Sequence, residues 1–136
     1  MLVSETNIRV RYAETDRMGY AYYGNYAQYY EVARVEALRQ LGISYKSLED
    51  SGIMMPVVQM ITNFKKPALY DDELTIRTII KEKPTVKMKF YYEIYNSDNI
   101  LINFGETILV FVNSKTMKPC QCPDWFKELL IEIETE

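Results

Sequence analysis

A single acid, Asp16, lies in a short segment with a glycine, Thr15–Gly19, shortly before a long helical pattern begins. The first N–H groups of a helix have no acceptor within the helix, and the helix dipole adds positive potential at that end. A carboxylate beside such donors places an attacking group or a base next to an oxyanion site. These residue types indicate acyl transfer, although they are equally typical of an Asp that forms a turn or caps a helix.

The chain contains no histidine. A Ser-His-Asp or Cys-His triad, a histidine metal ligand and a histidine general base are therefore all excluded within the chain. Proton transfer near neutral pH must be carried out by carboxylates, tyrosines, lysines, thiols or water.

No metal site is predicted. The only two cysteines, Cys120 and Cys122, are one residue apart. That spacing strains a disulfide and supplies too few ligands for zinc, so we expect two reduced thiols. The pair Asp71-Asp72 is expected to form a turn before a strand rather than a metal site.

The length of 136 residues predicts one domain over 1–136, long enough to bury a hydrophobic core. A net charge of −3 argues against nucleic acid as the main partner. The chain has no run of about 18 apolar residues, so no membrane-spanning helix is expected. Its first residues lack the basic and apolar regions of a signal peptide, and we expect a cytoplasmic protein.

The elements that must position Asp16 follow from the spacing of the apolar residues. In the first half they recur every three or four positions, which is typical of helices, and in the second half they alternate with polar residues, which is typical of strands. A loop is expected over 13–23. The strands are predicted at 6–12, 56–64, 73–80, 86–94 and 100–112. The helices are predicted at 24–41, 44–50 and 123–130, and in the last of these Trp125 and Leu129 are expected to pack inward.

Short turns at 83–85 and 96–99 separate the later strands. Consecutive strands with hairpin-length links form an antiparallel sheet, and one central helix can fill its concave face. The predicted fold class is therefore α+β, with the sheet wrapped around the long helix. Such a sheet leaves open edges and an outer apolar face, so we expect a homo-oligomer.

Two sequence motifs that are far apart in the chain are informative when they are considered jointly. The first is Arg11-Tyr12-x-Glu14-Thr15-Asp16-x-Met18-Gly19-x-x-Tyr22-x-x-Asn25-Tyr26, followed by Glu31, Arg34 and Glu36. The second is Phe64-x-x-Pro67-Ala68-x-Tyr70-Asp71-Asp72-x-Leu74, and Gly105-Glu106-Thr107 follows in the last long strand. Taken together over about residues 6–126, they resemble the hotdog-fold acyl-CoA thioesterases of the 4-hydroxybenzoyl-CoA thioesterase type.

The resemblance implies the hotdog fold and hydrolysis of an acyl-CoA to a free acid and CoA, with no metal and no tightly bound cofactor. The family's acid falls on Asp16, either as the nucleophile or as the general base for water. The N–H groups of about Tyr23 and Gly24 would hold the thioester oxygen. The resemblance also implies a homodimer or homotetramer with its sites between two subunits.

Many members of the family have histidine where this chain has Tyr23. A backbone N–H at that position is supplied equally well by tyrosine, whereas a role for the imidazole would be lost. Glu31 is a second candidate carboxylate, and an i,i+3 ion pair with Arg34 is its structural alternative. The missing histidine also leaves open a non-catalytic protein that binds acyl-CoA or a small ligand on the same fold.

Coenzyme A is polyanionic, so a chain with a net negative charge needs local positive charge to bind it. Lys65 and Lys66 next to the second motif are candidates, as are Lys87 and Lys89, which point the same way from one predicted strand. A solvated strand face is the alternative for each of them.

The remaining candidate substrate-binding residues lie between the loop and the first helical turns: Tyr22, Asn25 and Tyr26. The chain has twelve tyrosines, and several of them crowd this region. They are suited to an acyl pocket of moderate polarity and equally to a subunit interface.

Overall fold

The computed structural model describes residues 1–130. Its α-helices are α1 (Tyr26–Gln40), α2 (Tyr45–Asp50) and α3 (Asp124–Glu128), with short 3-10 helices at Tyr12–Glu14 and Tyr23–Asn25. Its strands are β1 (Leu2–Arg9), β2 (Ile53–Met54), β3 (Val57–Phe64), β4 (Glu73–Ile80), β5 (Lys87–Tyr95), β6 (Leu101–Val110), β7 (Val112–Asn113) and β8 (Lys118–Pro119).

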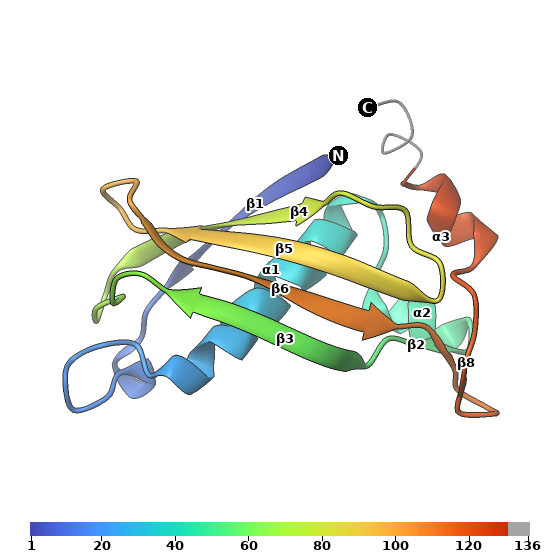
Figure 1. Ribbon diagram of the computed structural model, residues 1–136, viewed down its shortest axis with the longest axis horizontal. Coiled ribbons are helices and arrows are strands. Elements are labelled where there is room, and N and C mark those ends of the chain that lie inside the picture. Colours follow the sequence, from blue (N-terminus) through green and yellow to red (C-terminus); the bar gives the residue numbers. More distant parts are fainter. Residues whose placement is uncertain (131–136) are drawn as a thin grey trace.

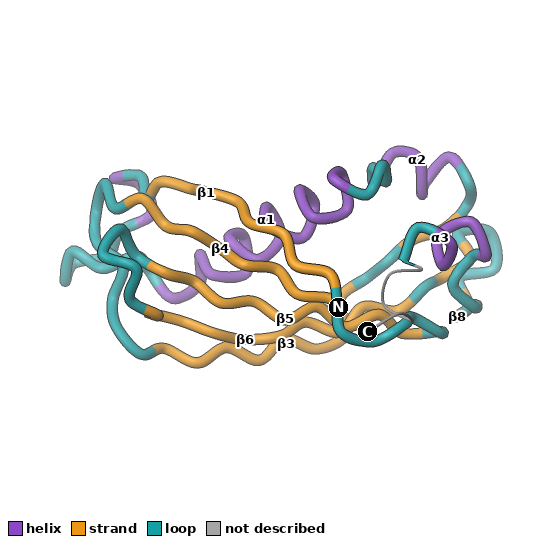
Figure 2. The backbone as a smooth tube through the Cα atoms, turned by 90° about the horizontal axis from the view of Figure 1, so that it is seen from above, coloured by secondary structure: helices purple, strands orange, loops and turns teal. Residues whose placement is uncertain are grey.

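One antiparallel sheet has the strand order β1-β4-β5-β6-β3, and α1 lies along one face of it (Figures 1 and 2). The strands β4 and β5 bury every second side chain against this helix, as the alternating pattern predicted. The long predicted helix and the α+β class with a sheet around it are confirmed. No helix in residues 1–130 is both long and apolar enough to cross a membrane.

The layer between α1 and the sheet is rich in tyrosine. Tyr30 of α1 stacks on Tyr92 of β5, with ring centroids 4.2 Å apart and an interplanar angle of 5°. The hydroxyl of Tyr30 also bonds Thr62, at 2.9 Å, and Asn103. A Cβ at Gly105 would lie 2.6 Å from the Tyr30 hydroxyl and 2.3 Å from a carbonyl oxygen of β3, so only glycine fits there. The approach of β3 to β6 thus depends on Gly105.

The first strand runs over Leu2–Arg9 rather than over 6–12, and Tyr12 begins a 3-10 helix instead. The half-buried positions of this strand include Ser4 and Thr6, which are polar, so the alternation of apolar residues is weak there. Beyond the strand, the backbone of Val10 bonds the backbone of Asp71 and Asp72. Asp71 has φ 67°, and the pair forms the expected turn.

The sheet does not follow chain order. β3 pairs with β6 at one edge rather than with β4, so the link over 65–72 crosses the sheet and is not a hairpin. The predicted strand over 100–112 is also divided, because β6 ends at Val110 and β7 joins β2 and β8 in a separate small sheet. Pairings between distant segments leave no local signal in the sequence.

The last helix is rotated relative to the prediction. Phe126 and Leu130 are fully buried, whereas Trp125 is 39% exposed and Leu129 is 41% exposed. Each residue turns a helix by about 100°, so a shift of one position exchanges inward and outward faces. The prediction that Trp125 and Leu129 pack inward is therefore wrong.

Candidate active site

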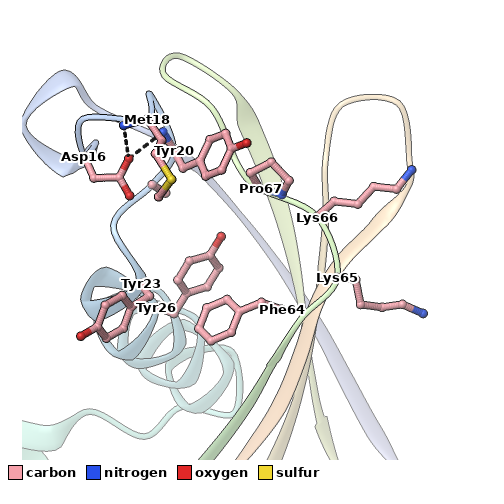
Figure 3. A pocket seen from close by; sticks show the side chains of 10 residues that line it. Asp16, Met18, Tyr20, Tyr23, Tyr26, Phe64, Lys65, Lys66 and Pro67 are labelled. Carbon is pink, nitrogen blue, oxygen red and sulfur yellow. Dashed lines mark hydrogen bonds between the residues drawn. The ribbon is translucent and has the colours of Figure 1, made fainter.

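The loop around Asp16 is closed by its own backbone. The Asp16 N–H donates to the Tyr20 carbonyl at 2.8 Å, and the Gly19 N–H donates to the Asp16 carbonyl at 3.0 Å. Gly19 adopts a φ of 79°, which is unfavourable for residues with a side chain. The carboxylate completes the turn, since Asp16 Oδ1 accepts the N–H groups of Met18 at 2.9 Å and Tyr20 at 3.2 Å (Figure 3).

Asp16 is thus a turn former, but only through one of its two oxygens. Within residues 1–130, Oδ2 has no hydrogen-bond partner. The side chain is half-buried and lines a cavity with Tyr20, Tyr23 and Tyr26 (Figure 3). The turn therefore fixes the carboxylate in place and leaves one oxygen available for chemistry.

Glu14 ties this loop to the helix. Its carbonyl accepts the N–H of Tyr22 at 2.8 Å and the side-chain amide of Asn25 at 2.7 Å. Its carboxylate accepts the Tyr29 hydroxyl at 3.0 Å and pairs with Arg11 at 3.0 Å. Asn25 therefore holds the loop in position and does not line the cavity.

The helix begins with the 3-10 turn Tyr23–Asn25, which runs directly into α1. In the described part of the chain, neither the Tyr23 N–H nor the Gly24 N–H donates to an acceptor. The Tyr22 ring packs beside that of Tyr23, tilted by 42° with centroids 4.7 Å apart, and lies against Gly24, where a Cβ would be 2.7 Å from it. Two N–H groups without an acceptor therefore lie at the start of the helix, one on Tyr23, which lines the cavity, and one on the next residue.

The cavity has a volume of about 300 Å³ and lies between the Asp16 loop, the start of α1 and the end of β3. Tyr26 is almost fully buried beside it and meets Phe64 edge to face, with centroids 5.1 Å apart. Burial raises the pKa of the Tyr26 phenol, which stays neutral. The lining residues are Asp16, Met18, Tyr20, Ala21, Tyr23, Tyr26, Phe64, Lys65, Lys66 and Pro67.

The structure therefore brings five predicted site residues around one cavity, namely Asp16, Tyr23, Tyr26, Lys65 and Lys66. Tyr22, Gly24 and Asn25 adjoin Tyr23 in the chain but do not line the cavity. Five further lining residues were not predicted as site residues: Met18, Tyr20, Ala21, Phe64 and Pro67. Phe64 and Pro67 belong to the second motif, so that motif was the signal for them.

Glu31 does not join this group, because it is exposed one to two turns farther along α1 and does not line the cavity. The ion pair with Arg34, which was the structural alternative for Glu31, is also absent from the described residues. Arg34 is buried and donates instead to the hydroxyls of Tyr45 and Tyr92.

Lys87 and Lys89 lie toward the other end of the sheet. Phe64 is opposite Asn103, and Asn103 is opposite Ile94, whereas Lys89 is five residues earlier in β5. At about 3.3 Å per residue the separation along the strand is about 17 Å. Within one chain these two lysines therefore do not reach the cavity.

A model of the family described as the thioesterase-like superfamily matches residues 10–130 of the chain. The chain belongs to this superfamily. The resemblance to hotdog-fold acyl-CoA thioesterases drawn from the sequence is thereby confirmed, and the relatives described next place this superfamily member in the class of thioester hydrolases.

Three relatives of this thioesterase-like chain cover nearly all of it. YneP of Bacillus subtilis (strain 168), which is named as a provisional acyl-CoA thioesterase, is 36% identical to this chain. The match covers 92% of this chain and 94% of the length of YneP. The acyl-CoA thioester hydrolase YbgC of Escherichia coli O6:H1 is 34% identical over 85% of this chain and 87% of its own. The DHNA-CoA thioesterase of Staphylococcus aureus has 36% identity and a TM-score of 0.92, over 99% of this chain and 93% of its own.

Proposed function

We propose that this protein hydrolyses an acyl-CoA thioester to a free acid and CoA, with Asp16 as the nucleophile or as the base for the attacking water. One observation carries the proposal. The Asp16 carboxylate is held by two backbone N–H groups through Oδ1, while its Oδ2 is open at a cavity that lies beside the start of α1. Superfamily membership supplies the thioester chemistry.

We assign the stabilisation of negative charge on the carbonyl oxygen of a bound thioester to the Tyr23 and Gly24 N–H groups, which have no acceptor in the described residues. If Asp16 Oδ2 attacks, an acyl–aspartyl anhydride forms, the C–S bond breaks, and water then releases the acid. If Oδ2 removes a proton from water, hydroxide attacks the carbonyl carbon and the same C–S bond breaks. A thiol with a pKa of about 8.5 leaves readily as a thiolate, so neither route needs a histidine to protonate the leaving group.

Coenzyme A binding is assigned first to Lys65 and Lys66, which line the cavity and follow β3 directly. Figure 3 shows both side chains extending away from the aromatic cluster of Tyr23, Tyr26 and Phe64. This arrangement suits a substrate whose acyl group lies among the aromatic rings while its phosphates meet the lysines outside.

A homodimer formed through β3 accompanies this function. β3 is an edge strand with one unpaired side, and seven of its eight residues are exposed. Thr62 bonds Tyr30 of α1, so Met60 and Phe64 share its helix-facing side, yet they are 36% and 52% exposed. A second copy paired antiparallel along this edge would cover them. It would also bring the Lys87 end of one sheet to the cavity end of the other.

The test is CoA release, followed with a thiol reagent, across aliphatic and aromatic acyl-CoAs. DHNA-CoA belongs in the panel because one relative is named for it. Burial raises the pKa of the Cys122 thiol to about 12, so background labelling is expected from Cys120 alone, and Cys120→Ser removes it. Turnover of any panel member supports the proposal. Acyl-CoA binding without turnover would instead favour the non-catalytic binding protein.

A further inference from the structure

A second cavity, of about 350 Å³, lies near the opposite end of α1, against α2 and β2. In Figure 1 these elements are at the right of the molecule, whereas the Asp16 loop is at the left. The wall of this cavity is largely apolar and is formed by Leu48, Ile53, Met54, Met55 and Pro56. No part of the proposed hydrolysis uses it.

The polar group in this cavity is Arg34, which is only 6% exposed. Its Nε donates to the Tyr45 hydroxyl at 2.9 Å and its Nη1 donates to the Tyr92 hydroxyl at 3.1 Å. Among residues 1–130, no carboxylate lies within 4.0 Å of this guanidinium. An arginine stays protonated in proteins, so a positive charge is buried here with neutral partners only.

The third nitrogen, Nη2, has no hydrogen-bond partner in the part of the chain that the structure describes. Nη2 is also not fully buried. Among residues 1–130, Thr78 Oγ1 is the only fully buried side-chain nitrogen or oxygen atom without a hydrogen-bond partner, so the unpartnered Nη2 must be accessible. Arg34 lines the cavity, so Nη2 is open to it. A buried cation with a free donor facing an apolar cavity is matched by an anion.

Tyr45 adds a second donor. Its hydroxyl oxygen accepts from Arg34, and its own proton has no acceptor within residues 1–130. By contrast, the Tyr92 hydroxyl is already paired with Thr107 at 2.6 Å. The lining of this apolar cavity therefore carries an N–H donor on Arg34 and an O–H donor on Tyr45, both without an acceptor in the described residues.

We propose that this cavity binds a small carboxylic acid with an apolar body. The planar guanidinium matches a carboxylate, Tyr45 donates to the same group, and the hydrocarbon lies against Met54 and Met55. The volume is at the lower end of the range of ligand cavities, which limits the body to a short chain or one ring. Glu49 is exposed at the rim and opposes the incoming charge, so it weakens binding without reaching Arg34.

The methionines report on this site directly, because Met54 and Met55 line it whereas Met18 lines the Asp16 cavity. We would label the methionine methyl groups of the full chain with ¹³C and titrate octanoate, benzoate and the neutral analogue octanamide. Saturable shifts of Met54 and Met55 by an acid, with octanamide at least about tenfold weaker, are expected. No shift of these two methyls, equal binding of octanamide, or shifts at Met18 alone would overturn the proposal.

Two variants sharpen the test. Arg34→Met should abolish the shifts at Met54 and Met55, but it removes a buried, hydrogen-bonded group and could unfold the chain. Glu49→Gln leaves Arg34 and the core untouched and should tighten octanoate binding by about two- to threefold, with no effect on octanamide. Weaker octanoate binding in Glu49→Gln would contradict the model of an anion held by Arg34.

The acid has two possible sources with the same chemistry, namely the product of thioester hydrolysis or an unrelated metabolite. Two groups of acids distinguish these sources. The protein hydrolyses the CoA thioesters of the first group and does not hydrolyse those of the second. Binding restricted to the first group assigns product binding, and binding of both groups assigns a general acid site. This proposal stands without the hydrolysis, because the shifts at Met54 and Met55 are measured whether or not CoA is released.

Discussion

Glu14 accepts a 3.0 Å hydrogen bond from the Tyr29 hydroxyl, which joins the loop carrying Asp16 to the buried face of α1. The same carboxylate accepts the Arg11 N–H and the Arg11 guanidinium, each at 3.0 Å. The position of Asp16 relative to the start of the helix therefore depends on a second carboxylate that does not line the cavity.

This role predicts a dependence of stability on pH. Partial burial raises the pKa of the Glu14 carboxyl, but the hydrogen bonds from Arg11 and Tyr29 outweigh it and hold that pKa below its usual 4.5. The stabilisation is therefore fully present above about pH 4.5 and is lost as the pH falls through the lower folded value. The free energy of unfolding should decline less between about pH 5 and 3 in Glu14→Gln than in the wild type.

Glu31→Gln is the matched control for Glu14→Gln, because Glu31 is an exposed glutamate on α1 with no ion pair in the described chain. Denaturant unfolding at several pH values measures both variants. If Glu14→Gln and Glu31→Gln declined in parallel with the wild type, Glu14 would have no special coupling to the fold.

Gly105 should tolerate no side chain. In Gly105→Ala the new Cβ would meet the Ile61 carbonyl oxygen at 2.3 Å and the Tyr30 hydroxyl at 2.6 Å, so β3 must shift or Tyr30 must move. We expect a loss of about 2–4 kcal/mol in the free energy of unfolding, measured by denaturant titration. Gly42→Ala is the control, since its φ of 85° carries strain but no atom lies within 4 Å. It should cost only about 1–2 kcal/mol, and a loss at Gly105 no larger than at Gly42 would refute the close approach.

The spacing of the apolar residues and the residue types at the turns were sufficient to predict the long helix, the alternating strands β4 and β5, and the α+β class. They were insufficient where inward positions are polar, as at Ser4 and Thr6, and where one residue of phase decides burial, as at Trp125 and Phe126. The order of the strands in the sheet could not be predicted from local patterns either, because β3 pairs with β6, which lies about forty residues later in the chain.

The site divides in the same way. Asp16 and the start of the helix are neighbours in sequence, so their proximity was predictable. Lys87 and Lys89 were grouped with the site by charge and by their shared strand face, and only the strand register shows Lys89 about 17 Å along the sheet and Lys87 farther still. Arg34 was placed in an ion pair by its i,i+3 spacing from Glu31, but that spacing carries no information about the buried hydroxyls of Tyr45 and Tyr92.

The edge of β3 should hold the proposed dimer together. Met60→Glu places a charge on the helix-facing side of this edge, the side that also carries the exposed Phe64. We expect sedimentation to give about twice the 16.0 kDa of one chain, or a multiple of it, for the wild type and a lower mass for Met60→Glu. Gln59→Glu adds the same charge on the outer side of the strand and should keep the wild-type mass. A monomeric wild type would exclude the dimer.

The central claim is that the Asp16 carboxylate carries out the chemistry, and Asp16→Asn tests it most directly. Asn retains the shape and an oxygen for the N–H groups of Met18 and Tyr20, but it removes the negative charge. Asp72→Asn is the control, because Asp72 likewise accepts a backbone N–H, from Leu69 at 2.8 Å, in the neighbouring loop. The measurement is kcat for CoA release on the best substrate of the panel. A fall of at least about 100-fold in Asp16→Asn, with Asp72→Asn close to wild type, is predicted, and activity of Asp16→Asn within about threefold of wild type would contradict the account.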